Sequence, residues 1–157
     1  MKSFISRGKK PICKWGTLPD NIFFEGSVPD GYSLCIVPSG EYIVLDVDRH
    51  GDENGFDHIP DDILLELEKT FNYSTKNNGV HYWLKSKNNV NMVNKNSGFS
   101  MDLRCHWKGY VVWYHKGDVR DYLDEINYTS DRLNAWLEEL FKRAGKKKLN
   151  KKQKNEH

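Results

Sequence analysis

The feature that most constrains the fold is an apolar stretch that ends in alternating carboxylates, over residues 42–48. Its β-branched and aromatic residues are typical of a buried strand. Because side chains alternate along a strand, Asp46 and Asp48 should project from the same face, with their backbones roughly 6–7 Å apart. Two neighbouring carboxylates repel each other unless a cation lies between them. Oxygen ligands favour Mg²⁺ or Mn²⁺, and Mg²⁺ often shares its ligand shell with phosphates. The simpler interpretation is that Asp48 only begins the polar loop of residues 49–54.

Length and composition predict one globular domain. The chain has 157 residues, of which 38% are hydrophobic, enough to bury a core. No apolar stretch reaches the roughly 20 residues that cross a bilayer, and the first residues lack the apolar segment of a signal peptide. Cys13, Cys35 and Cys105 form neither a disulfide pattern nor a paired metal motif. We therefore expect a cytoplasmic protein with reduced thiols and no membrane partner.

Charge divides the chain into two parts. Residues 142–157 contain seven Lys and one Arg against one acid, Glu156, which gives this tail a net charge of +7 and leaves −5 for residues 1–141. A lysine-rich segment with few apolar residues cannot bury enough surface to fold. We therefore expect a single domain over residues 1–141 and a disordered tail over 142–157. The tail would bind nucleic-acid phosphates independently of sequence, or would serve only to keep the protein in solution.

The remaining patterns predict strands in sequential pairs with helices after them. Strand patterns cover six stretches: residues 32–37, 42–48, 71–75, 80–84, 100–104 and 110–114. Short connections favour pairing these strands in sequence as three antiparallel hairpins. Helix patterns follow Pro60, Asp118 and Thr129. The prediction is an α+β fold with a mostly antiparallel sheet and flanking helices.

A second polar cluster precedes a histidine on the fourth of these strands. Residues 76–79, Lys-Asn-Asn-Gly, are a strong hairpin-turn pattern, and His81 follows two residues after Gly79. Exposed backbone N–H groups in such a turn, with Lys76 beside them, can hold phosphate oxygens, and His81 could donate to the same phosphates. A single histidine on a strand is also common as a structural residue, and Lys76 alone would be a solvated turn residue.

The third cluster centres on Asp102, which lies between the apolar Met101 and Leu103. An unpaired charge would be costly there. Asp102 either pairs with Arg104, two residues along on the same face, or joins the two earlier aspartates as a third metal ligand. Three carboxylates that hold two metal ions are a common means of activating a hydroxyl and stabilising a leaving pyrophosphate.

These motifs, in this order, resemble the prim-pol branch of the archaeo-eukaryotic primase superfamily, which occurs at the N-terminus of phage and plasmid replication proteins. Residues 46–48 resemble its first acidic motif, Asp-hydrophobic-Asp. Residues 75–83 resemble its turn that ends in Gly-x-His, and residues 102–112 resemble its Asp-hydrophobic-Arg segment. Residues 10–15, Lys-Pro-Ile-Cys-Lys-Trp, are similar to its Lys-x-Pro…Trp segment. The resemblance extends over residues 9–115.

The resemblance implies a primase-type catalytic core derived from an RNA-recognition-like sheet. It implies template-directed nucleotidyl transfer, that is, a DNA primase or polymerase in the bacterial or host cytosol. By this likeness Asp46, Asp48 and Asp102 would be the catalytic residues and would hold two Mg²⁺ or Mn²⁺ ions. The 3′-hydroxyl of a primer would attack the α-phosphate of the incoming nucleotide in line.

The same likeness implies a nucleotide-binding set around the turn. His81 would contact the phosphates of a nucleoside triphosphate, and Gly79 with the preceding Lys76 and Asn77 would shape that pocket. Arg104 would contact a phosphate or the primer end. The partners implied are a single-stranded DNA template, nucleoside triphosphates and a separate helicase, since the chain has no P-loop signature.

The chain departs from the family pattern at two points. Lys-Asn-Asn at residues 76–78 replaces Pro-Ser-Gly, and residues 112–116 lack the Pro-Pro-Ser of typical members. Two other functions stay open at this level. One is a catalytically silent nucleic-acid-binding module of the replication machinery with the same fold. The other is a metal-dependent nuclease, in which the same carboxylates would activate water.

Overall fold

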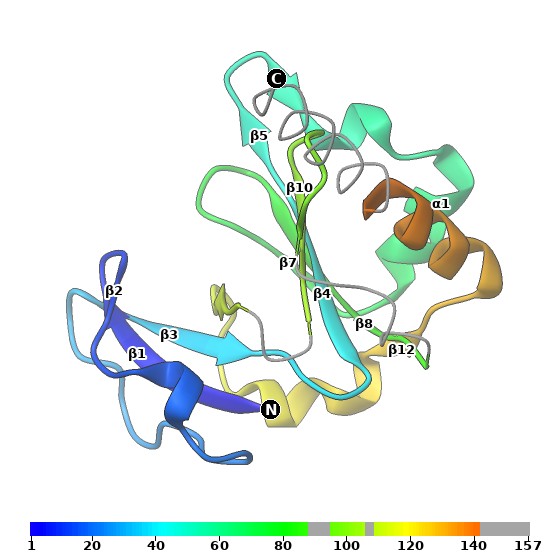
Figure 1. Cartoon of the computed structure of the whole chain (residues 1–157). Helices are drawn as coiled ribbons and strands as arrows, with labels where there is room; N and C mark the ends of the chain where they lie inside the picture. The colour runs from blue at the N-terminus through cyan, green and yellow to red at the C-terminus, as the bar shows by residue number, and fades with distance from the viewer. Residues whose placement is uncertain (88–94, 106–108, 142–157) are drawn as a thin grey trace, which may run out of the picture.

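The computed structural model describes residues 1–87, 95–105 and 109–141. These residues form an α+β fold with two mostly antiparallel sheets, as the sequence predicted for the class (Figure 1). Sheet A, which contains β1, β2 and β3, lies on the left in Figure 1. Sheet B lies in the middle, and α1 lies to its right. The predicted Lys-rich tail, residues 142–157, lies outside the described residues.

Sheet A has the strand order β11-β3-β1-β2, with all neighbours antiparallel. Its strands are β1 (Lys2–Arg7), β2 (Lys10–Pro11), β3 (Tyr32–Val37) and β11 (Val111–Val112). The short 3-10 helix η1 (Trp15–Thr17) follows β2. Trp15 stacks on Phe4 of β1 at 6.1 Å between ring centroids, and Tyr110 meets both rings edge-on. This aromatic contact ties the start of the chain to the segment that enters β11.

Sheet B has the strand order β12-β8-β4-β10-β9, and β7 also pairs with β8. Its strands are β4 (Tyr42–Val47), β7 (Asn72–Ser74), β8 (Val80–Lys85), β9 (Lys95–Asn96), β10 (Met101–Arg104) and β12 (Asn127–Tyr128). Every pairing is antiparallel except that of β12 with β8. The strand with alternating carboxylates, β4, is therefore central, between β8 and β10. A two-stranded ribbon of β5 (Arg49–His50) and β6 (Glu53–Asn54) follows it.

Two of the three predicted hairpins are wrong. The predicted hairpin of residues 32–37 with 42–48 does not form, because β3 pairs with β1 and β11 whereas β4 pairs with β8 and β10. The short turn between β3 and β4, closed by the Tyr42 N–H to the Ser39 carbonyl at 3.1 Å, carries the chain from one sheet to the other. Likewise β10 and β11 belong to different sheets. The third prediction, β7 with β8, is confirmed.

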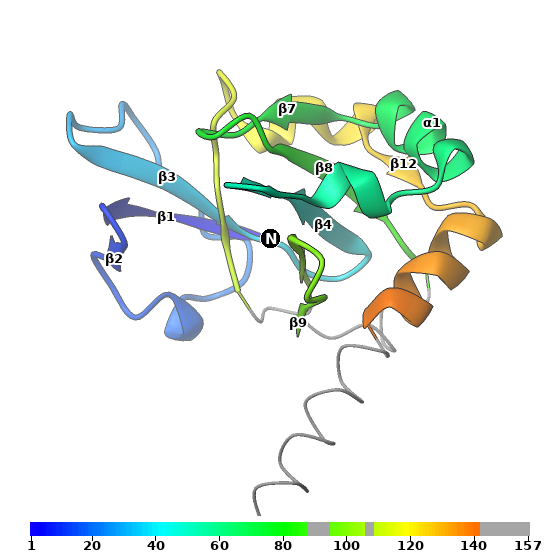
Figure 2. The same cartoon turned by 90° about the horizontal axis from the view of Figure 1, so that it is seen from above.

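Two helices cover one face of sheet B (Figure 2). They are α1 (Asp61–Lys69), which begins after Pro60 with two acids in its first turn, and the helix over residues 131–141. Ile43, Leu45 and Val47 of β4 point toward them and are fully buried. The helices supply Ile63, Leu67, Leu133, Leu137 and Phe141 to the same core. Burial of alternate residues fixes the face that β4 turns away from the helices.

The opposite face of sheet B is only partly covered. Val44 and Trp83 pack there with aromatic residues from β7 and the segment after β11, in a second core. The segment predicted as a helix after Asp118 is a 3-10 helix, η4 (Val119–Glu125), whose N-cap is Asp118 with a capping box. Further along the same face, β4 places Asp46. A further short 3-10 helix, η2 (Gly55–His58), follows β6. Among the described residues, no helix combines the length and apolar character needed to cross a membrane.

Candidate functional site

Strand register places the predicted polar residues in one row across sheet B. Asp46 of β4 lies directly opposite His81 on β8 and directly opposite Asp102 on β10. His81 in turn lies opposite Tyr73 on β7. Residues directly opposite each other in antiparallel strands share a face and have neighbouring side chains. The pairing therefore gathers residues from four strands on the face that the helices leave open.

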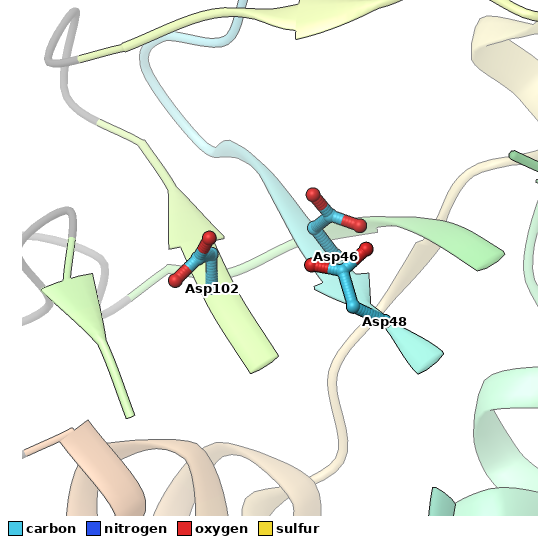
Figure 3. A group of neighbouring side chains, drawn as sticks. All are labelled: Asp46, Asp48 and Asp102. Atoms are coloured by element: carbon cyan, nitrogen blue, oxygen red, sulfur yellow. The ribbon is translucent and has the colours of Figure 1, made fainter. Parts of the chain in front are cut away.

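The three predicted carboxylates converge. Asp46, Asp48 and Asp102 each offer one oxygen, and these oxygens all lie within 4.8 Å of one another. Figure 3 shows Asp46 on β4 and Asp48 directly after its end, with Asp102 on the neighbouring strand β10. Arg104 Nη2 also lies 3.4 Å from Asp102 Oδ2. The ion pair predicted for Asp102 is therefore present, and Asp102 also lies close enough to Asp46 and Asp48 to serve as a third ligand for a metal ion.

The backbone of Asp48 is fixed by two loops. Its N–H donates to the Ser100 carbonyl at 2.8 Å, and its carbonyl accepts from the Gly55 N–H at 3.0 Å. Ser100 has a φ of +58°, a conformation that costs a non-glycine residue free energy. A Cβ on Gly55 would lie 2.6 Å from the Ser100 carbonyl oxygen, so only glycine fits there. The backbone of Asp48 is therefore held in place directly after the end of β4.

The carboxylate cluster is electrostatically unfavourable without a cation. Burial raises the pKa of Asp48 to about 6, the Asp46 carboxylate adds to the rise, and His50, whose Nε2 lies 3.5 Å from Asp48, opposes it. Asp46 Oδ1 is buried and has no hydrogen-bond partner among the described residues. His81 Nε2 lies 3.3 Å from that oxygen, but the approach is not aligned as a hydrogen bond. A buried carboxylate oxygen without a donor normally costs stability.

These observations fit a metal site. The cluster offers only carboxylate oxygens, the ligands that hard divalent cations prefer. A cation among them would satisfy the buried oxygen of Asp46 and relieve the repulsion that acts on Asp48. The three carboxylates could thus bind a metal ion.

A pocket of about 240 Å³ opens beside Asp46 and Asp48. Predicted nucleotide-binding residues line it together with an aromatic side chain that the sequence did not single out: Lys76, Asn77, His81, Arg104 and Tyr114. Val111 and Val112 of sheet A close the other side. The pocket therefore lies where the two sheets meet, and its polar lining includes two basic side chains next to the carboxylates.

The turn before His81 is held against the end of β4. Its backbone closes through the Thr75 N–H to the Gly79 carbonyl at 2.9 Å, and Asn78 takes the left-handed conformation with φ +62°. A Cβ on Gly79 would lie 2.5 Å from the Val47 carbonyl oxygen and 2.8 Å from Thr75 Oγ1. Gly79 shapes the pocket by allowing this close approach, while Lys76 and Asn77 line it.

A second depression, of about 250 Å³, lies on another side of the carboxylates. Asp48 and Asp102 line it with His50, Glu53 and Ser100, whose hydroxyl donates to Glu53 at 3.1 Å. Sequence reasoning missed this side entirely, because the residues come from the ribbon β5–β6 and from the loop before β10. The carboxylates are therefore reachable from two sides, one with basic and aromatic groups and the other mostly acidic.

Compared with models of known protein families, the chain matches none. A search of curated proteins also finds no match. The chemistry of the site is therefore inferred from its own geometry: a carboxylate cluster that could bind a divalent cation, and beside it a pocket whose lining includes Lys76, His81 and Arg104.

Two further residues near the site had escaped the sequence reasoning. Tyr73 contacts His81. The sequence could have indicated this contact, because the predicted hairpin around residues 76–79 places Tyr73 opposite His81. Tyr114 is 45% exposed, and its ring centroid lies 6.0 Å from that of His81. No signal pointed to Tyr114, because its segment was predicted to pair with residues 100–104.

Proposed function

We propose that this domain performs metal-dependent, template-directed nucleotidyl transfer, as a DNA primase or polymerase of phage or plasmid replication. The proposal rests on one observation, which is that a carboxylate cluster and a pocket with basic side chains lie side by side. Three carboxylates lie within 4.8 Å of one another, and a pocket with Lys76, His81 and Arg104 opens beside two of them. Nucleotidyl transfer needs a site for divalent cations directly beside a site for a polyphosphate.

In this proposal Asp46, Asp48 and Asp102 hold two Mg²⁺ or Mn²⁺ ions. When bound, these ions would supply Lewis-acid polarisation of the attacking hydroxyl and of the leaving pyrophosphate. The carboxylates would fix the positions of these ions, because Asp48 is anchored by its backbone and Asp46 lies in the central strand. The central position of β4 supports a rigid site of this kind.

The pocket would receive the phosphates of the nucleoside triphosphate. Lys76 and Arg104 bring positive charge, Asn77 brings an amide, and His81 brings a ring whose Nε2 lies 3.3 Å from Asp46 Oδ1. The incoming α-phosphate would lie between the pocket and the carboxylates. The terminal hydroxyl oxygen of the primer would bond to this phosphorus as the bond to pyrophosphate breaks, and the hydroxyl proton would pass to solvent.

The proposed activity is tested by incubating the protein with a single-stranded DNA template, labelled nucleotides and Mn²⁺ or Mg²⁺. The comparison is with Asp46→Ala/Asp48→Ala, and Asp52→Ala/Asp57→Ala is the matched control, since it removes two exposed acids outside the cluster. We expect labelled products from the wild type and the control, and none from the first variant.

The other functions compatible with the sequence are outcomes of the same assay. If the wild type degrades the template and the first variant does not, the domain is a metal-dependent nuclease and not a polymerase. Template binding without products or degradation, equal in wild type and variant, would contradict both enzymatic functions and leave a silent nucleic-acid-binding module. A template that requires unwinding would in addition need the separate helicase that we propose as a partner.

A further inference from the structure

The side chain of His81 is held from behind by a buried chain of hydrogen bonds. The Trp83 Nε1–H donates to the Tyr73 hydroxyl oxygen at 3.1 Å, and the same hydroxyl lies 3.2 Å from His81 Nδ1. All three residues are buried, and Trp83 is fully so. His81 Nε2 is the ring nitrogen on the other side, 3.3 Å from Asp46 Oδ1. His81 itself lines the pocket.

The direction of these hydrogen bonds can be deduced. Trp83 Nε1 can only donate, so the Tyr73 oxygen accepts from it. Among the described residues His81 Nδ1 is the sole remaining partner of the Tyr73 hydroxyl, so the O–H must donate to Nδ1 or stay unsatisfied. A buried hydroxyl hydrogen without an acceptor is destabilising.

The carboxylate side favours the same arrangement. If the ring proton were on Nδ1, the lone pair of Nε2 would face the Asp46 carboxylate at 3.3 Å. With the proton on Nε2, the N–H lies on the side of that carboxylate and of the pocket, although it is not aligned with Oδ1 as a hydrogen bond. Both neighbours of the ring therefore select the neutral form that carries its proton on Nε2.

We propose that Tyr73, itself oriented by Trp83, is a positioning residue that keeps neutral His81 in the Nε2–H form. The pocket thus presents the His81 Nε2–H as a hydrogen-bond donor before any ligand binds. The ligand must offer an acceptor there, such as a phosphate oxygen. That a nucleotide supplies this oxygen rests on the proposed function; the position of the ring proton does not.

The first test is a long-range ¹H–¹⁵N correlation spectrum at about pH 8, where free histidine is neutral. The chain has six histidines, so His81 is assigned by comparison with His81→Gln. We expect the pattern of a ring protonated on Nε2. A pattern with the proton on Nδ1 would overturn the proposal, and this measurement needs only the wild type and the assignment variant.

The second test measures binding of inorganic triphosphate by Tyr73→Phe. We expect affinity to fall about 3- to 10-fold, the effect of weakening one hydrogen bond to a charged ligand. The matched control is Tyr82→Phe, because Tyr82 is also a buried tyrosine but lies next to His81 in β8 on the opposite face. Affinity unchanged in Tyr73→Phe, relative to wild type and to this control, would contradict the positioning role.

A double-mutant cycle separates positioning from general loss of structure. In a His81→Gln background, the amide of glutamine donates without help from Tyr73, so Tyr73→Phe should have no further effect on triphosphate binding. An equal loss in both backgrounds would show that Tyr73 acts independently of His81 and would overturn the proposal. A wild type that binds no triphosphate would contradict the proposed function instead, and the NMR result would still decide the position of the proton.

Discussion

At the scale of single residues, Asp48 has the clearest electrostatic consequence. Its pKa in the folded protein is raised to about 6 by burial and by Asp46, compared with about 3.9 in an unfolded chain. Between about pH 4 and 6 the folded protein therefore holds a proton that the unfolded chain has lost. Ionised Asp48 lowers stability above that range, and the loss is recovered as the pH falls through it.

Asp48→Asn should therefore raise the Tm of the metal-free protein at about pH 8, and the gain should shrink toward about pH 5. Thermal unfolding with a chelator measures both values. Asp52→Asn, an exposed acid outside the cluster, is the control and should leave Tm unchanged. A variant less stable than wild type at about pH 8 would contradict the idea that the cluster is strained without a cation.

If the pocket binds a nucleotide as proposed, Tyr114 is well placed to contact its base. Its exposed ring lines the pocket beside His81, and stacking of a base on an aromatic side chain is worth about 1–3 kcal/mol. We expect Tyr114→Ala to weaken ATP binding about tenfold while inorganic triphosphate binds as before, and Tyr114→Phe to behave like the wild type. Equal losses for both ligands in calorimetric titrations would place Tyr114 near the phosphates instead.

At the scale of elements, the turn between β7 and β8 depends on the absence of a side chain at Gly79. A Cβ there would meet backbone at 2.5 Å, so Gly79→Ala must push the turn away from the end of β4. We expect a lower Tm and weaker triphosphate binding. Gly16→Ala is the matched control, because no atom lies within 4 Å of the added Cβ. If Gly79→Ala binds triphosphate like this control, the turn does not form the phosphate pocket.

The sequence was sufficient to predict elements whose signals are local. Alternation in β4 predicted that Asp46 and Asp48 share a face, and the Lys-Asn-Asn-Gly pattern predicted the β7–β8 hairpin. Pairing between distant strands was not predictable in this way. The strand β1 was missed because Lys2, Ser3 and Ser6 are buried polar residues; the Lys2 ammonium is satisfied by the Leu18 carbonyl at 2.8 Å, a contact that only the folded chain creates.

The same limitation explains the two wrong hairpins. Once β1 is available, β3 has a partner along its whole length, from Lys2 opposite Val37 to Arg7 opposite Tyr32. β4 is then free to become the centre of sheet B. The error did not affect the carboxylates, because their convergence depends on the pairing of β4 with β10, which places Asp102 beside Asp46.

At the scale of the whole molecule, the site depends on the meeting of the two sheets. Sheet B supplies the carboxylates, His81 and Arg104, whereas sheet A supplies the wall formed by Val111 and Val112. The aromatic contact of Phe4, Trp15 and Tyr110 connects that wall to β1 and to the 3-10 helix η1.

The Lys-rich tail, residues 142–157, carries a net charge of +7 and should attract nucleic-acid phosphates. Removing residues 145–157 should weaken binding of single-stranded DNA at about 50 mM salt, and the difference should shrink at about 200 mM, because fewer phosphates are neutralised. Fluorescence anisotropy measures the affinities, and an unchanged Tm confirms that the domain is intact. Equal affinities for the full and shortened chains at both salt concentrations would make the tail a solubilising segment only.

The proposed function requires that the three carboxylates hold divalent cations next to a phosphate pocket. The most direct measurement is a crystal structure with Mn²⁺ and a non-hydrolysable nucleoside triphosphate, using the anomalous scattering of manganese. We expect anomalous peaks among Asp46, Asp48 and Asp102, with the phosphates against Lys76 and His81. A map with the nucleotide bound elsewhere, or with no manganese at these carboxylates, would contradict the account.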